Sequence, residues 1–245
     1  MKQTVIIFIL FICILPYMGS IFAQTPPNTL SEQEKSEGWV LLFNGVNLDG
    51  WTSVGRQTPP ERGWTVEEGQ LIVNKGGRQR GGDIITKEMY AQFDFYFEFK
   101  LTKAANSGIK YFFTRYEQGG WLGNEYQVLD DDFHPDARAG RNGNRTTASL
   151  YDVLPPDGNK QMKPTGEWNV GRIVAIGSEV RHYLNGELVL TYDRKSALYE
   201  EAVKLSKFNE VQPGFGTVEK GYILLQDHDD EVAYRNIKIR DLSNN

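Results

Sequence analysis

The sequence has very little cysteine. Its 245 residues include one, Cys13, which lies inside an apolar run at the N-terminus. Once that segment is removed as a leader, the remaining chain has no cysteine and forms no disulfide, so a packed hydrophobic core has to hold the fold together. Roughly 220 residues are enough to bury such a core.

Basic charge is not in excess, and long apolar runs are missing beyond the N-terminus. The chain has 27 lysines and arginines against 32 acidic residues, a formal net charge of −5. An acidic chain lacks the basic footprint that binds nucleic acid or anionic lipid, so we expect neither as a partner and no membrane insertion. No internal repeat, low-complexity tract or second domain boundary interrupts the sequence.

The first residues have the anatomy of a secretory signal peptide. Lys2 precedes an unbroken apolar run, Val5 to Leu15, and a cut site follows Ala23. The run is too short and wrongly flanked for a membrane span. Residues 1–23 are therefore predicted to be a signal peptide, residues 24–30 a tether and residues 31–242 one domain of a periplasmic or secreted protein. The bulky Ile12 before Cys13 argues against a lipoprotein site.

Helix signals are few. Ser31 and Glu34 stand at capping-box spacing and predict a short helix that ends near Glu37. A second helix is predicted from a cap at Ser196 to about Lys207, and its apolar residues at helical spacing are Leu198, Ala202 and Leu205.

Strand signals dominate the rest. In Phe93–Leu101 every second residue is apolar, which predicts a strand with one buried and one wetter face. Asn185-Gly186 predicts a tight hairpin turn. Further strands are predicted at 39–43, 70–74, 107–114, 125–129, 149–151, 169–176, 180–184, 187–192, 222–226 and 232–239. The pattern predicts an all-β, antiparallel two-sheet sandwich or jelly roll with one or two short helices.

The stretch from Asn106 to Asp132 combines an amine, a carboxylate and an amide on neighbouring strands. The strand period of two puts Glu125 and Gln127 on one face, and it separates Lys110 from its apolar neighbours. Trp121 lies in a glycine-rich stretch that we interpret as a loop, where it would form a platform for a sugar ring. The other tryptophans considered, Trp39, Trp51 and Trp168, are predicted to lie in the core.

Seven short motifs, in order, carry a resemblance to a known family. They are Leu42-Phe43-Asn44-Gly45 with Leu48-Asp49-Gly50-Trp51, Asn106-Ser107-Gly108-Ile109, Glu125 to Asp130, Gly166-Glu167-Trp168-Asn169, Leu184-Asn185-Gly186, Leu225-Gln226-Asp227-His228 and Tyr234 to Ile239. From about Ser31 to Leu242 the chain resembles the 3-keto-disaccharide hydrolase or 3-keto-glucoside lyase/hydratase domain family. Members often have glycine after the Gln-Asp-His triplet, whereas Asp229 and Asp230 follow it here; aspartate tolerates the left-handed turn.

The resemblance implies a concanavalin-A-like jelly roll with a sugar site on its concave face. It also implies an exported enzyme acting on an oligosaccharide or glycoside, whose ketone an upstream sugar 3-dehydrogenase would supply. A ketone at C3 acidifies the hydrogen at C2, so a base can remove it and the aglycone then leaves from C1. The resulting double bond can add water.

Such chemistry needs a base, an oxyanion donor and an acid. The catalytic candidates are Lys110, Glu125 and His228, one of only three histidines. A lysine on an inner face is partly desolvated, which favours the neutral amine that a base needs. The substrate-binding candidates are Asn106, Gln127, Asp130, Trp121, Tyr151, Gln226 and Arg115.

No cofactor is predicted with certainty. Asp130, Asp132 and His134 have the donor atoms for a divalent metal ion that would steady an enolate, while a solvated acidic loop is the alternative interpretation. Two other functions stay open. One is a lectin-like module that binds glycans without turnover, because the fold hosts both. The other is a conventional glycosidase in which Asp130, Glu167 or Asp227 partners Glu125.

Overall fold

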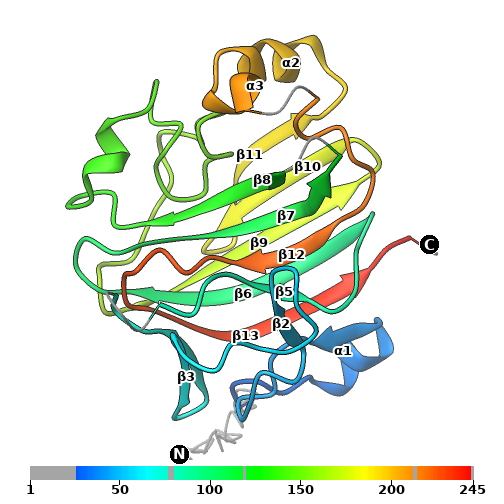
Figure 1. Ribbon diagram of the computed structural model, residues 1–245, viewed down its shortest axis with the longest axis vertical. Helices are drawn as coiled ribbons and strands as arrows, with labels where there is room; N and C mark the ends of the chain where they lie inside the picture. The colour runs from blue at the N-terminus through cyan, green and yellow to red at the C-terminus, as the bar shows by residue number, and fades with distance from the viewer. Residues whose placement is uncertain (1–25, 77–79, 118–119, 212–213, 244–245) are drawn as a thin grey trace, which may run out of the picture.

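Two antiparallel sheets lie face to face, as the alternation of apolar and polar residues predicts (Figure 1). The computed structural model describes residues 26–76, 80–117, 120–211 and 214–243. The predicted signal peptide, at 1–23, lies outside these residues, and so do the first two residues of the predicted tether. None of the described helices has the length and apolar character needed to cross a membrane.

The larger sheet contains eight strands among the described residues, in the order β11-β10-β9-β6-β13-β4-β3, with β1 paired to β13. Its strands are β1 (Trp39–Leu41), β3 (Trp64–Glu67), β4 (Gln70–Val73), β6 (Phe93–Leu101), β9 (Trp168–Ile176), β10 (Glu179–Leu184), β11 (Glu187–Asp193) and β13 (Val232–Asp241). The predicted hairpin joins β10 to β11, where Asn185 and Gly186 have φ of 51° and 91°.

The smaller sheet contains five described strands in the order β2-β5-β12-β7-β8. They are β2 (Trp51–Ser53), β5 (Ile84–Thr86), β7 (Asn106–Tyr116), β8 (Gly120–Leu129) and β12 (Tyr222–Leu225). The predicted all-β jelly roll is confirmed.

The core fills the space between the sheets. The alternating apolar residues of β6 are 0–1% exposed. They meet side chains from β7 and β8 that are 0% exposed, namely Ile109, Tyr111, Tyr126 and Val128. Phe97 and Tyr126 pack edge to face with ring centroids 5.4 Å apart. Because side chains alternate along a strand, the residues between these turn to the outer face of the smaller sheet.

A chain of hydrogen bonds also runs through the core. Asn124 Nδ2 donates to the Tyr192 hydroxyl at 2.9 Å, and the Tyr192 and Tyr111 hydroxyls lie 2.5 Å apart. The Tyr111 hydroxyl lies 2.7 Å from His182 Nε2, and His182 Nδ1 lies 2.9 Å from the Ala148 carbonyl. Since a carbonyl only accepts, Nδ1 carries the proton, and Nε2 accepts from Tyr111.

Three short helices occur among the described residues. Helix α1 (Glu32–Ser36) has the predicted capping box, in which the Ser31 hydroxyl accepts from the Glu34 amide. Helix α2 (Ala197–Lys204) is capped by Ser196 as predicted. Helix α3 (Lys207–Val211) follows it. In Figure 1, α2 and α3 lie together at the opposite end of the long axis from α1.

The predicted extent and buried face of the second helix are wrong. The helix ends at Lys204, and the Ser206 hydroxyl accepts from the Phe208 amide where α3 begins. Leu198 and Leu205 are 70% and 69% exposed, while Tyr199 and Val203 are buried. Tyr199 and Val203 are four residues apart and form an equally good helical stripe, which the sequence pattern did not distinguish.

The strand predictions also need correction in three respects. Strands β2, β3 and β5 were not predicted, because three or four residues are too few to show a period of two. Ser149–Tyr151 is a turn in which Leu150 makes isolated bridges to Tyr126 and Leu154. The glycine-rich stretch from Gly120 to Asn124 is the start of β8 rather than a loop.

The tryptophan predictions were right for one residue of three. Trp51 is 0% exposed in the core, where Trp64 joins it at 6%. Trp39 and Trp168 are half-buried on the outer face of the larger sheet. Cations lie over both rings, with Arg240 5.3 Å from the Trp39 centroid and Arg235 4.1 Å from the Trp168 centroid. Cation–π contacts replace burial at these two positions.

Candidate functional site

The pairing register collects polar residues in adjacent rows on the outer face of the smaller sheet. Lys110 pairs with Glu125 on one side and with Leu224 on the other, and directly paired residues share a face. Two residues along β7, Gly108 pairs with Gln127. A pocket of ≈ 270 Å³ opens over these rows and is lined by Asn106, Lys110, Leu122, Glu125, Gln127, Tyr151, Lys207, Phe208, Gln226 and His228.

The centre of the pocket is a buried carboxylate beside an ammonium group. Glu125 is 6% exposed, and its Oε2 lies 3.8 Å from Lys110 Nζ. Burial raises the pKa of Glu125, and the charges of Lys110 and Lys207 oppose that rise. A carboxyl group with a raised pKa is a stronger base when ionised and stays protonated to a higher pH, so it suits proton transfer near neutrality.

One end of the pocket presents amides and an imidazole. Gln127 is 1% exposed; its Nε2 donates to Asn106 Oδ1 at 3.4 Å, and its Oε1 is buried without a hydrogen-bond partner among the described residues. An unpaired buried acceptor is costly unless a ligand supplies the donor, as a sugar hydroxyl does. The exposed His228 ring lies at the pocket's edge, its Nε2 3.5 Å from Asn106 Nδ2.

The two aspartates after His228 are used in the local fold. Asp229 adopts φ of 68°, which confirms that aspartate accepts the left-handed turn at this position. The Asp230 carboxylate accepts from the Asn106 amide at 3.1 Å. The departure from the family pattern therefore fixes the start of β7 next to the pocket.

Helix α3 adds two residues that the sequence reasoning missed. Lys207 and Phe208 line the pocket, and the Lys207 ammonium lies 4.4 Å from the centre of the Tyr151 ring. Burial lowers the pKa of Lys207, against the pull of Glu125. Tyr151 is held by a 2.7 Å hydrogen bond to Asp136. The break between the two helices places Lys207 at the pocket, and the sequence pattern, which predicted one continuous helix, did not show it.

Asp83 is a carboxylate that the sequence pattern also missed. It immediately precedes β5, and its Oδ1 accepts from the Asp227 amide at 2.9 Å. Burial raises the pKa of Asp83, and the nearby charge of Lys110 opposes the rise. No strand was predicted here, so the sequence offered no register that would bring Asp83 close to Lys110.

Several predicted residues lie elsewhere. Arg115 is exposed at the far end of β7, paired with Trp121, and neither lines the pocket. Asp130 is 2% exposed, and its carboxylate accepts from the Ala104 and Asp132 amides at 2.7 and 3.2 Å. Asp130 therefore shapes a turn instead of facing the pocket.

The predicted cation site is not formed. His134 Nδ1 accepts from the Asp136 amide at 3.2 Å, and the Asp130 oxygens are engaged as above. No group of three or more His, Cys, Asp or Glu side chains in the described part of the chain is arranged to hold a metal ion. Local turns take the donor atoms of Asp130 and His134, while Asp132 is exposed.

The carboxylate pair of a conventional glycosidase is also not evident. Asp227 is 0% exposed and accepts from the Gly81 and Gly82 amides at 2.9 and 2.8 Å. Asp130 is engaged in its turn, and Glu167 is exposed in the turn before β9. None of the three lines the pocket with Glu125.

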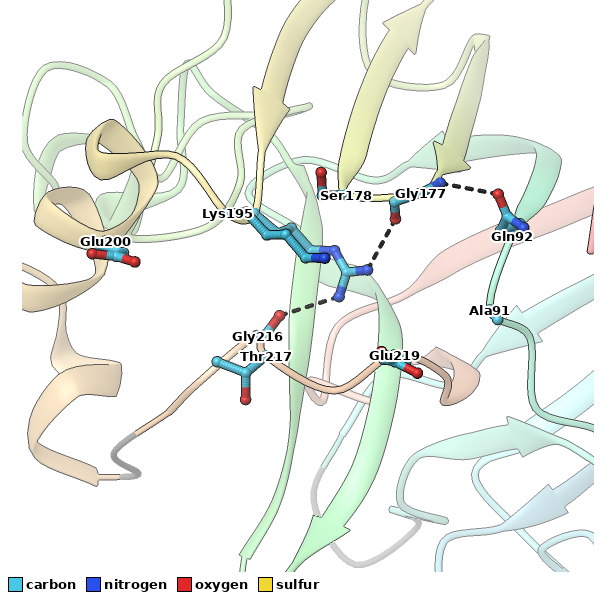
Figure 2. A pocket seen from close by; sticks show the side chains of 10 residues that line it. Ala91, Gln92, Gly177, Ser178, Lys195, Glu200, Gly216, Thr217 and Glu219 are labelled. Carbon is cyan, nitrogen blue, oxygen red and sulfur yellow. Dashed lines mark hydrogen bonds between the residues drawn. The ribbon is translucent and has the colours of Figure 1, made fainter.

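A separate cavity of ≈ 510 Å³ is lined by Gly177, Lys195 and Gly216, among others (Figure 2), and Arg194, the residue after β11, also lines it. The guanidinium donates to the carbonyls of Gly216 and Gly177 at 3.2 and 3.3 Å, and it stacks 3.9 Å from the Phe112 ring centre. The two terminal nitrogens donate to backbone carbonyls, so Arg194 joins the segment before β12 to the larger sheet.

An antiparallel sandwich hosts many unrelated functions, so the fold alone does not assign one. Residues 38–240 match the family described as the 3-keto-alpha-glucoside-1,2-lyase-like domain. The chain belongs to this family. The 3-keto-disaccharide hydrolase of Bacteroides thetaiotaomicron is 34% identical over 230 residues, which cover 84% of this chain and 79% of that protein.

Two solved structures share the fold. Both are crystal structures of proposed glycosyl hydrolases from Parabacteroides distasonis. One is 31% identical, covers 89% of this chain and all of its own, and superposes with a TM-score of 0.77. The other is 26% identical, covers 83% of this chain and 99% of its own, and has a TM-score of 0.60.

Proposed function

We propose that the protein cleaves 3-keto-glycosides by elimination through a C2 enolate, followed by addition of water. The observation that carries the proposal is the buried carboxylate of Glu125, 3.8 Å from the half-buried Lys110 ammonium, in the pocket where Gln127 has an unpaired oxygen. The family and its relatives make a carbohydrate-active enzyme the general class. The name of the Bacteroides thetaiotaomicron relative, 3-keto-disaccharide hydrolase, supports the substrate class.

In the proposed first step, ionised Glu125 removes the proton at C2. The electrons of the C2–H bond form an enolate with its charge on the C3 oxygen. The enolate then expels the aglycone from C1, and the departing oxygen takes a proton. Water adds across the new C1–C2 double bond and leaves a free 3-keto sugar, so the net reaction is hydrolysis although the bond breaks by elimination.

Two ammonium groups flank Glu125 and would perform the other two tasks. Lys110 and Lys207 both act electrostatically on its carboxylate. One ammonium stabilises the negative charge on the C3 oxygen, and the other protonates the leaving oxygen. Burial lowers the pKa of Lys207, which favours proton donation, so we assign Lys207 to the leaving group. Lys110, next to Glu125, is assigned to the enolate.

The amide end of the pocket would orient the keto sugar. Gln127 Oε1 accepts from a ring hydroxyl, and Asn106, Gln226 and His228 provide further polar contacts. His228 at the edge is also the competing base, since a neutral imidazole removes protons at ordinary pH. The substitution His228→Asn distinguishes these roles. Loss of a general base lowers kcat, whereas loss of a sugar contact mainly raises KM.

The second candidate function is a glycan-binding module without turnover. The unpaired Gln127 oxygen favours it, because amides alone suffice to bind hydroxyls. The two functions separate when the protein is incubated with 3-keto-trehalose and with 3-keto-glucosides, with and without EDTA. Release of aglycone supports the function as an enzyme. If EDTA abolishes the release, the reaction requires a metal ion. Shifted ligand resonances without release support the binding module.

We also propose export. The signal-peptide pattern supports it, and sequencing of the mature N-terminus after expression in a bacterium with a periplasm tests it. A start at Gln24 is expected; a chain that keeps Met1 contradicts it. The substrate ketone implies an upstream sugar 3-dehydrogenase, because an unoxidised glycoside has no acidic hydrogen at C2.

A further inference from the structure

Trp121 lies outside the pocket but on the same face of the smaller sheet. A β-bulge at Phe112, with φ of 51°, shifts the register of β7 against β8 between Tyr111 and Thr114. The extra residue returns the next side chain, Phe113, to the outer face, where it pairs with Tyr222. Ile85, Phe113 and Leu224 form a small apolar cluster there, with Trp121, Tyr222 and Val54 packed against it.

The indole of Trp121 covers the Phe113 ring. Their centroids are 5.4 Å apart and their planes differ by 19°, while Tyr222 lies 6.5 Å from the indole. Phe113 is 2% exposed, whereas Trp121 is half-buried. One face of the indole therefore lies against Phe113, and the other is turned outward.

The surface around Trp121 continues toward the pocket along β8. Trp121 and Glu125 are four residues apart on β8, which corresponds to ~13 Å at about 3.3 Å per residue. The residue between them on the same face is Gly123, which has no side chain. A Cβ at Gly123 would lie 2.8 Å from the Tyr111 carbonyl and 2.9 Å from Phe113 Cα, so glycine is required by the bulge.

We propose that Trp121, Phe113 and Tyr222 form an aromatic shelf that binds the leaving group of the substrate. The inference rests on the proposed function and extends it to the substrate class: glycosides whose aglycone is a second sugar ring or an aromatic ring. The apolar face of either stacks on an indole. The keto sugar then lies toward Gln127, with its C1 oxygen directed along β8 toward the shelf.

The experiment compares two substrates in Trp121→Ala. With a 3-keto-disaccharide, kcat/KM falls about tenfold, since binding energy from the remote ring is lost. With methyl 3-keto-glucoside, which has no ring to stack, kcat/KM stays within about twofold. Trp121→Phe restores part of the loss. The control is Trp168→Ala, which removes an indole from the opposite sheet and affects neither substrate.

Equal losses on both substrates with an unchanged melting temperature contradict the shelf, and so does no loss on either. A melting temperature that falls in Trp121→Ala and in Trp121→Phe alike, with equal losses on both substrates, assigns the indole to stability alone. If the wild type turns over neither substrate, the proposed function fails, and saturation-transfer NMR decides the shelf separately. Contacts to the leaving-group ring that disappear in Trp121→Ala support it; unchanged contacts overturn it.

Discussion

The carboxylate of Glu125 occupies the space that a side chain at residue 108 would fill. A Cβ built on Gly108 would lie 2.3 Å from Glu125 Oε1 and 3.0 Å from its carboxyl carbon. The two residues are on neighbouring strands and two residues apart in the register, because Gly108 pairs with Gln127. The glycine therefore lets the carboxylate lie over β7, where it faces the pocket with Lys110.

Gly108→Ala is predicted to displace the Glu125 carboxylate and to lower kcat by about tenfold or more, because misplacement by an ångström weakens proton transfer strongly. The fold should survive, since a glutamate terminus can move. Gly158→Ala is the matched control, because a Cβ there meets nothing within 4 Å. Full activity in Gly108→Ala would show that the position of the carboxylate is unimportant.

Glu125→Gln is predicted to lower kcat by about 100-fold or more, as expected for loss of a general base. The melting temperature should not fall, because the amide fills the same space and removes a buried charge. Steady-state kinetics with a thermal melt check both. A folded variant with wild-type kcat rules out Glu125 as the base.

The two lysines should respond differently to the leaving group. Lys207→Gln is predicted to lose activity on an alkyl 3-keto-glucoside and to recover it on a p-nitrophenyl 3-keto-glucoside, because a good leaving group needs no proton. Lys110→Gln should lose activity on both, since the enolate forms in either case. The reverse pattern exchanges the two assignments. Rates on both substrates for both variants decide it.

The pH dependence of activity follows from Glu125. Its raised pKa means that kcat/KM falls as the pH drops through a value above the usual range of a glutamate, because the base must be ionised. Lys110 and Lys207 lower that pKa, so Lys207→Met should move the acid limb to higher pH. Lys204→Met, which removes an exposed lysine paired with Glu201, should leave the limb unchanged. An acid limb that does not move in Lys207→Met contradicts the electrostatic coupling between Lys207 and Glu125.

Stability should fall between pH 7 and 5 because His182 is buried neutral. Burial lowers its pKa from 6.5 to about 4. The unfolded chain takes up a proton as the pH falls through 6.5, while the folded chain does not until about 4. The stability contribution is thus complete above that upper value and is lost below it, by about 2 kcal/mol at pH 5. Urea unfolding at both pH values measures the loss, and His182→Gln should remove most of it.

The sequence predicted the strands that alternate strongly and the residues whose face those strands decide. Lys110, Glu125 and Gln127 could be predicted to share one face because β7 and β8 are long enough for a period of two to show in the sequence. Lys207 and Asp83 were missed for the opposite reason. Their positions depend on a helix break and on a three-residue strand, and each is set by tertiary packing rather than by a local pattern.

The glycine-rich stretch around Trp121 shows a second limit. The glycines predicted a loop, yet Gly123 lies in β8. Glycine is needed at this position because the bulge at Phe112 leaves no room for a Cβ opposite it. A bulge changes which side chains share a face, and nothing in the local composition announces it. The metal site predicted from the acidic run after β8 was wrong for a similar reason. The turns formed by Asp130 and His134 engage the atoms that a metal ion would need.

The central claim is that Glu125 removes the C2 proton, and deuterium incorporation tests it most directly. The mature protein is incubated with 3-keto-trehalose in D₂O, and the released 3-keto sugar is followed by NMR. With wild-type protein, the product is predicted to carry deuterium at C2. With Glu125→Gln, both the release of product and the incorporation of deuterium are predicted to be slower. Release of a product that keeps hydrogen at C2 would contradict the enolate, and with it the role of Glu125.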